Sequence, residues 1–165
     1  MKRATDTRPA PGALRRAVLL GLFAGTGVAC GYLLSGLPNF ELMSLVAALA
    51  GGVLGIGGGA ASGALAAAAF SLGNPLGAPV PVVLAAQVAG LALAGATGGA
   101  AAPALLRLRR RGRRWAAAGA GLATGLAITL AYDLLTNLAG AVAFDLPWAV
   151  ALAGAVPFSL IHLAG

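Results

Sequence analysis

The eleven lysine and arginine residues of this chain are confined to two short segments. Five lie in the N-terminal residues 1–16, and the other six lie in residues 107–114, which read RLRRRGRR. The sequence between and after these segments is strongly apolar. Because cytoplasmic loops of membrane proteins retain Lys and Arg while short external loops exclude them, the pattern predicts a membrane protein with both basic segments on the cytoplasmic side.

Composition agrees with this interpretation. Apolar residues make up 59% of the chain, charged residues only 9%, and the mean hydropathy is +0.92, all far from the values of a soluble domain. The net charge of +7 would also suit a nucleic-acid-binding protein. However, the charges flank apolar spans, so nucleic acid is not an expected partner. The N-terminus lacks a convincing signal-peptide cleavage site, so we expect its apolar run to be the first membrane helix.

Six membrane spans are predicted when the apolar sequence is divided at Pro, Gly and Asn, since a crossing helix needs about 20 apolar residues. The fold class is therefore all-α, a polytopic membrane protein with six transmembrane helices and both termini cytoplasmic. Residues 1–16 form a basic cytoplasmic tail, and residues 17–165 form a single transmembrane domain with a cytoplasmic loop at 107–114. The predicted spans are 17–35, 41–55, 58–72, 82–106, 115–141 and 148–165.

The count of six depends on a break at the glycine run 57–59 between the second and third spans. If these two spans were one helix, the second basic segment would lie outside the cell, against the charge rule. Each of the two spans is short, so tilt or local thinning of the bilayer is required.

Small residues form a stripe on the first span, at intervals of four residues. Lipid provides little hydrophobic drive for helix association, so small residues at this spacing favour close approach of two helix backbones. The stripe is explained either by packing inside the bundle or by docking of another membrane subunit, and spacing alone does not distinguish the two. It consists of Ala17, Gly21, Gly25 and Ala29.

Several polar residues fall within or beside the spans, where ionisable groups are costly and by default mark a site or pathway. Asp133 and Asn137 are four residues apart and share a helix face, which Tyr132 flanks. No Lys or Arg lies within the spans to neutralise Asp133. It is therefore either protonated, hydrogen-bonded to His162, or reserved for a substrate. The others are Glu41 and Gln87, and the six-span topology places Asn39, Glu41, Asn74 and Asp145 toward the external side.

Structural roles explain some of these residues equally well. A carboxylate is favoured near a helix N-terminus, which accounts for Glu41 and Asp145. Asn74 precedes a proline and is a common turn former. His162 also suits a hydrogen-bonded histidine inside the bundle.

The sequence does not match the enzyme motifs that its polar residues suggest. Ser62 and His162 superficially pair as in an intramembrane serine protease, but Ala60 stands where that motif has glycine. There is no His/Cys cluster for zinc and no GxxxxGK[ST] phosphate-binding loop. The single cysteine, Cys30, excludes an internal disulfide. We therefore expect no catalytic activity, no metal and no cofactor.

Five short phrases follow one another along the apolar sequence. They are PNFEL at 38–42, FSLGNPLG at 70–77, AAQ at 85–87, AYDLLTN at 131–137 and PFSLIH at 157–162. In this order and spacing they resemble the substrate-binding (S) components of energy-coupling factor (ECF) vitamin transporters, over residues 17–165. The chain departs from that family in ending early in its last span. It also begins Met-Lys-Arg rather than with the Met-His type of start found in nickel or cobalt S components, which disfavours a metal ion as substrate.

The resemblance implies a six-helix protein of the bacterial cytoplasmic membrane that captures a vitamin or related micronutrient at the external side. Such proteins deliver the substrate together with a transmembrane T component and two cytoplasmic ATPases. In that family small residues of the first helix contact the T component, a pattern that Ala17, Gly21, Gly25 and Ala29 match. The family's substrate site maps here onto Asn39, Glu41, Asn74, Gln87, Tyr132, Asp133, Asn137 and His162.

Two other functions stay open at this point. A membrane scaffolding protein needs the small-residue faces but no ligand, and an autonomous small-solute carrier needs no ATPase partners.

Overall fold

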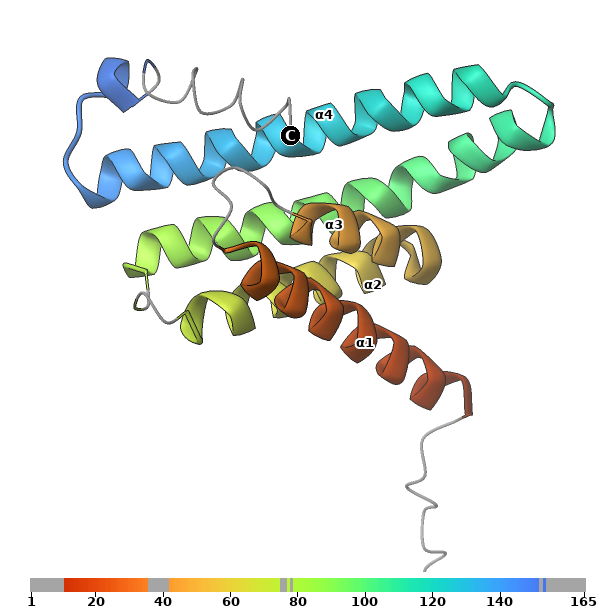
Figure 1. Ribbon diagram of the computed structural model, residues 1–165, viewed down its shortest axis with the longest axis horizontal. Coiled ribbons are helices and arrows are strands. Elements are labelled where there is room, and N and C mark those ends of the chain that lie inside the picture. The colour runs from red at the N-terminus through yellow and green to blue at the C-terminus, as the bar shows by residue number, and fades with distance from the viewer. Residues whose placement is uncertain (1–10, 36–41, 75–76, 78, 152, 154–165) are drawn as a thin grey trace, which may run out of the picture.

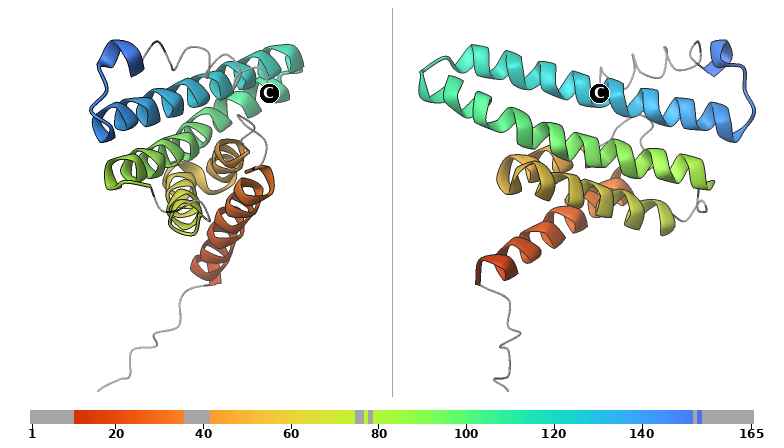
Figure 2. Two further views of the ribbon diagram at one scale, coloured as in Figure 1. Left: turned by 60° about the vertical axis from the view of Figure 1, so that its left-hand side comes forward. Right: turned by 180° about the vertical axis from the view of Figure 1, so that it is seen from behind.

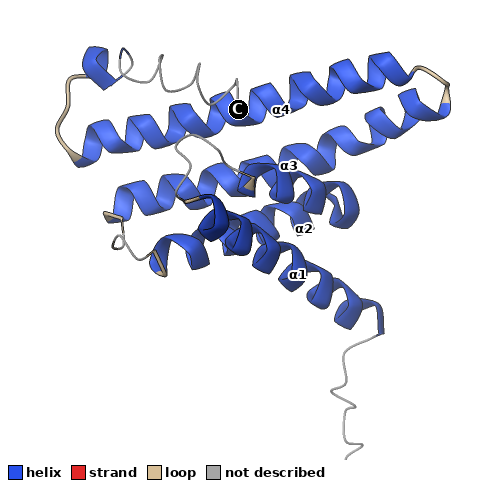
Figure 3. Cartoon of the chain, in the orientation of Figure 1, coloured by secondary structure: helices blue, strands red, loops and turns tan. Residues whose placement is uncertain are grey.

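The computed structural model of the chain describes residues 11–35, 42–74, 77, 79–151 and 153. It contains four long helices, α1 (Pro11–Leu34), α2 (Met43–Leu72), α3 (Pro81–Arg110) and α4 (Arg114–Ala143), and the described part has no strand (Figures 1 and 3). The predicted all-α class is therefore confirmed. Each long helix is by length and composition able to cross a membrane, as expected of a multi-pass membrane protein.

The helix α2 is broken at Gly55, which has φ 78° and ψ 176°, a conformation accessible essentially only to glycine. The halves on either side of the break contact each other. A Cβ atom added to Gly59 would strike the backbone of Gly51, and one added to Gly63 would lie 3.2 Å from the Cβ of Ala47. Both pairs are symmetric about residue 55, so residues 43–54 and 56–72 form an antiparallel helical hairpin (Figures 1 and 2).

The sequence predicts this reversal, but at residues 57–59 rather than at Gly55. Gly58 and Gly59 are helical and buried, because the hairpin uses their missing side chains for close packing. At about 1.5 Å per residue the first half is only about 18 Å long, against a hydrocarbon core of about 30 Å. The six-span topology, whose last span falls mostly outside the described residues, therefore stays a prediction.

The centre of the molecule is a junction of glycines where α3 crosses the hairpin of α2. A Cβ atom on Gly51 would strike the carbonyl oxygen of Gly95, and one on Gly95 would strike the backbone of Gly59. The largest fully buried side chains are only those of Leu91 and Ser62. Close backbone approach through small residues thus takes the place of a core of large side chains, as is common in membrane bundles.

The second basic segment, predicted as a loop over residues 107–114, is largely helical. α3 continues through Arg110, because Arg and Leu are good helix formers. It ends where Gly112 adopts a φ of 73°. The amide of Gly112 donates to the carbonyl of Arg109 at 3.0 Å and that of Arg113 to the carbonyl of Leu108 at 3.0 Å, which is a Schellman motif. Only three residues, 111–113, separate α3 from α4.

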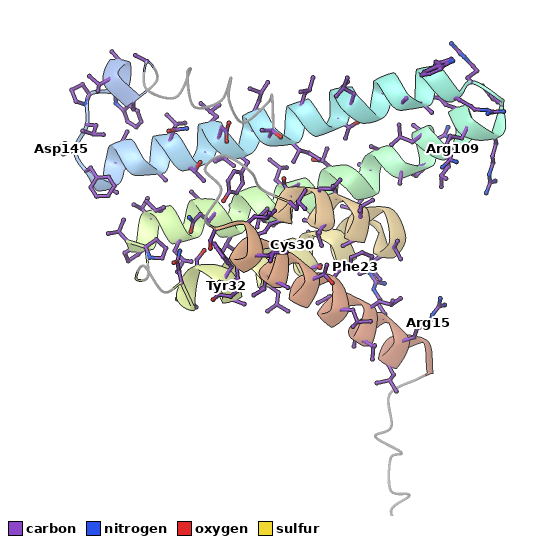
Figure 4. The ribbon with its side chains drawn as sticks, in the orientation of Figure 1. Arg15, Phe23, Cys30, Tyr32, Arg109 and Asp145 are labelled. Atoms are coloured by element: carbon purple, nitrogen blue, oxygen red, sulfur yellow. The ribbon has the colours of Figure 1, made fainter. Side chains whose placement is uncertain are left out.

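The described basic residues gather at one end of the bundle. Arg15 and Arg109 lie toward this end in Figure 4, whereas Asp145 lies at the other. The guanidinium of Arg16 donates to the carbonyl of Leu54 at 3.5 Å, which ties the start of α1 to the turn of the α2 hairpin. We call this the basic end of the molecule, defined by Arg15, Arg16, the last turn of α3 and the first turn of α4.

Candidate functional site

Asp133 is an ionisable side chain buried inside the bundle, with 2% of its surface exposed. It lies on the half of α4 that is remote from the basic end. Its backbone carbonyl accepts a hydrogen bond of 2.7 Å from the side-chain amide of Asn137, and the hydroxyl of Thr136 donates to the carbonyl of Tyr132 at 3.0 Å. In both bonds a side chain binds the carbonyl of the preceding helical turn. Tyr132, Asp133, Thr136 and Asn137 thus form a polar surface on this part of α4.

Tyr132 connects this polar surface to the rest of the protein. A Cβ atom on Gly90 of α3 would lie 2.6 Å from the Cδ2 atom of its ring, so the ring occupies the space left by that glycine. The ring also packs against the largest apolar cluster, which brings α1, α2 and α3 together. The buried members of this cluster are Ala24, Met43, Ala66, Ala67 and Leu91.

Gln87 lies one turn before Gly90 on α3 and pairs with the end of α2. The hydroxyl of Ser71, which is 3% exposed, donates to the Oε1 atom of Gln87 at 2.8 Å. Three residues after Ser71, the carbonyl of Asn74 accepts a hydrogen bond of 3.0 Å from the amide of Gly77. The backbone of Asn74 therefore takes part in a turn, and the role of its side chain stays a prediction.

The structure describes five of the eight predicted site residues, and all five lie in the half of the bundle remote from the basic end. They come from the α2–α3 connection, the first two turns of α3 and the last four turns of α4. The remaining three fall outside the described residues. The described five are Asn74, Gln87, Tyr132, Asp133 and Asn137; the other three are Asn39, Glu41 and His162.

Ser71 is a polar member of this region that the sequence prediction missed. Its type and position were visible within the FSLGNPLG phrase, but a serine in an apolar helix is also a common small packing residue. Its partner Gln87 is 16 residues away, so only the packing of α2 against α3 shows that the two meet.

Asp145 lies in the turn that ends α4. It has a φ of 51°, the left-handed conformation that Asp tolerates better than most residues. The amide of Leu146 donates to the carbonyl of Ala141 at 2.9 Å, which is the 6→1 bond typical of a Schellman motif. This favours a structural role for Asp145 and sets it apart from the buried Asp133.

The small-residue stripe of α1 faces away from the other described helices. All four of its residues are exposed, and a Cβ atom on Gly21 or Gly25 would meet no described atom within 4 Å. The opposite face carries the contacts with α2: a Cβ atom on Gly27 would lie 3.2 Å from that of Ala66, and one on Gly31 would lie 2.7 Å from the sulfur of Met43. Packing within the described bundle therefore leaves the stripe uncovered.

Three cavities lined by described residues lie elsewhere. Two of them, of about 460 and 570 Å³, adjoin along the first half of α2, the second half of α3 and the first half of α4. The third, of about 300 Å³, lies between Arg15, Arg16 and the turn of the α2 hairpin. None of the three is lined by the five described site residues, so the predicted site is a polar surface within the packed helices rather than any of these cavities.

The described residues contain no group of three or more His, Cys, Asp or Glu side chains that could hold a metal ion. Cys30 is a half-buried free thiol on α1.

Comparisons of the chain with known protein families, with curated proteins and with solved structures found no match.

Proposed function

We propose that the protein is the substrate-capture subunit of an ECF-type importer, which binds a vitamin or related micronutrient at the external side of the bacterial cytoplasmic membrane. The observation that carries the proposal is the burial of Asp133 on a membrane helix, in the half of the bundle remote from the basic end. Such a group is costly in a membrane and by default marks a site or pathway. With the basic end cytoplasmic, Asp133 belongs to the external half.

The described side chains of the proposed site, all in the half of the bundle remote from the basic end, suit a small polar or amphiphilic nutrient. A carboxylate and the amides of Gln87 and Asn137 recognise ring N–H, amine or hydroxyl groups, while the ring of Tyr132 provides an apolar surface. The described arginines lie toward the other end, so a phosphorylated ligand would lack the guanidinium partners that it prefers. Asn39, Glu41, Asn74 and His162 complete the proposed set.

The exposed stripe of α1 supports the proposed partners. Ala17, Gly21, Gly25 and Ala29 allow a second membrane helix to approach the backbone of α1 closely. We propose that this helix belongs to a T component, which itself binds two cytoplasmic ATPases.

Two measurements on the full chain test the proposed function. Mass spectrometry of small molecules released by denaturing the detergent-purified protein is expected to find one nutrient-like compound in stoichiometric amount. Co-expression with a T component and its ATPases is expected to yield a purifiable complex. An empty protein that forms no complex would favour a scaffold and contradict the proposal. A loaded protein that transports without ATPases would instead identify an autonomous carrier.

Substitutions in the stripe separate docking from internal packing. We expect Gly21→Leu and Gly25→Leu together to reduce co-purification of the T component by at least about tenfold, the effect of losing about 1.4 kcal/mol. The thermal midpoint of the isolated protein should stay unchanged, since both positions have open space around them. Gly31→Leu is the contrasting variant, because its side chain would displace Met43 and Phe70. Gly31→Leu should lower the thermal midpoint. If the double variant at Gly21 and Gly25 left co-purification of the T component unchanged, docking through this stripe would be excluded.

A further inference from the structure

A groove runs along the side of the bundle between the first half of α2 and the first half of α4. It consists of the two adjoining cavities of about 460 and 570 Å³. These share the lining residues Leu49, Gly52, Ala102 and Leu105, so the two cavities lie directly beside each other along the same helices. Each of the two volumes lies within the range of about 300–1,000 Å³ that is typical of sites for small molecules.

The inner part of the groove is an apolar trough. Leu45 and Ile128 line it, and Gly121 and Gly125 leave its wall on α4 open, with no described atom within 4 Å of a Cβ atom at either glycine. The hydroxyl of Thr124, which also faces the groove, already donates to the carbonyl of Ala120 at 2.7 Å. The trough therefore suits a hydrocarbon chain.

The outer part of the groove opens at the basic end, where Arg109 and Arg114 line it. Neither arginine has a described carboxylate close by: Asp145 lies at the opposite end (Figure 4), and Asp133 lies about 28 Å from Arg114 along α4 at about 1.5 Å per residue. Trp115, next to Arg114, is 91% exposed, as expected of a tryptophan at the membrane–water interface. The two cations thus lie at the level of the lipid headgroups.

We propose that this groove binds an anionic phospholipid of the surrounding bilayer, with its phosphate between Arg109 and Arg114 and one acyl chain along the trough toward Ile128. The positive charge at the outer part of the groove and the apolar lining of the inner part both favour an amphiphilic ligand. A free anion would leave the trough empty, and an apolar helix would leave two guanidinium groups without an anion. Guanidinium groups bind phosphate through paired hydrogen bonds, and basic pockets between membrane helices at the cytoplasmic face select anionic headgroups. This site is distinct from the proposed nutrient site.

Native mass spectrometry of the full-length protein tests the charged part of the site, with phosphatidylglycerol and phosphatidylcholine of identical acyl chains as probes. We expect the wild type to bind phosphatidylglycerol at least about tenfold more tightly, since each arginine near the surface contributes about 1 kcal/mol. The double variant Arg109→Ala, Arg114→Ala should lose this preference. Arg110→Ala, Arg111→Ala removes the same charge from neighbouring residues that do not line the groove and should retain it.

The apolar part is tested by filling the trough. Gly125→Phe places a ring in open space and is expected to reduce binding of phosphatidylglycerol at least about tenfold, while Gly119→Phe, on α4 but outside the groove lining, should not. If the two double arginine variants lost the preference for phosphatidylglycerol equally, the preference would come from general surface charge and the proposal would be overturned. The absence of any headgroup preference in the wild type, or unchanged binding in Gly125→Phe, would overturn it as well.

Discussion

Gly95→Ala is expected to lower the free energy of unfolding by about 1–3 kcal/mol, and Gly95→Leu to prevent folding. The reason is that a side chain at Gly95 would point at the backbone of Gly59 and lie 2.9 Å from the amide nitrogen of Ala60. Backbone atoms cannot rotate away as a flexible side chain can. The α2 hairpin and α3 would have to separate, which would open the junction where the most extensive helix–helix interface of the described bundle lies. The thermal midpoint of the detergent-purified protein measures the loss.

Gly57→Ala is the matched control for this prediction. Gly57 is also a helical glycine of the same bundle, but a Cβ atom there would meet no described atom within 4 Å. Because alanine is favoured over glycine within a helix by about 1 kcal/mol, this variant should be as stable as the wild type or more so. If Gly95→Ala behaved like Gly57→Ala, close packing at the junction would not be what holds α2 and α3 together.

Asp133→Asn is expected to weaken binding of the co-purified nutrient by about 10- to 150-fold. A hydrogen bond to a charged group contributes about 1.5–3 kcal/mol, and each 1.4 kcal/mol corresponds to a factor of about ten. Asn has nearly the same shape as Asp, so the change replaces one carboxyl oxygen by an amide N–H donor without opening a cavity. Titration calorimetry of the purified variant with the compound released from the wild type measures the affinity directly.

Asp145→Asn is the control for the carboxylate. Asp145 is exposed and occupies a left-handed position at the end of α4, which asparagine also accepts. Its replacement should leave the affinity unchanged. Undiminished affinity in Asp133→Asn would exclude a role for Asp133 in binding. Retained affinity combined with a transport rate that no longer depends on pH would indicate a proton-coupled carrier instead.

Most of the fold was predictable because a membrane restricts a chain to few solutions. Every backbone polar group in lipid must be hydrogen-bonded within the protein, so a long apolar segment has to be helical. Hence the predicted span over residues 115–141 agrees closely with α4, Arg114–Ala143. The end of α3 was less predictable, because arginines signal the membrane surface and still continue a helix as far as Gly112.

The reversal within α2 was harder to locate. Three consecutive glycines at residues 57–59 have the lowest helix propensity in the segment, yet the chain turns at Gly55. Gly58 and Gly59 remain helical because their backbones contact Leu54 and Gly51 in the other half of the hairpin. That contact exists only once the hairpin has formed, so no local property of the sequence could assign the turn to Gly55.

At the candidate site, too, one part could be predicted from the sequence and another part depended on the folded structure. The cost of a carboxylate in lipid is a property of the residue and its apolar surroundings in the sequence, and it is enough to single out Asp133. The burial of Asp133 and the pairing of Ser71 with Gln87 depend instead on helices that meet only after folding.

Hydropathy and charge alone specify an all-helical membrane protein and predict that its arginines lie at one surface, because burying backbone and charge in lipid is prohibitively costly. They do not specify which small residues of α1 are used inside the protein. Gly21, Gly25, Gly27 and Gly31 are equally small, yet the last two pack on α2 and the first two stay exposed. That choice follows from the shape of the surface that the α2 hairpin presents, and this surface exists only in the folded molecule.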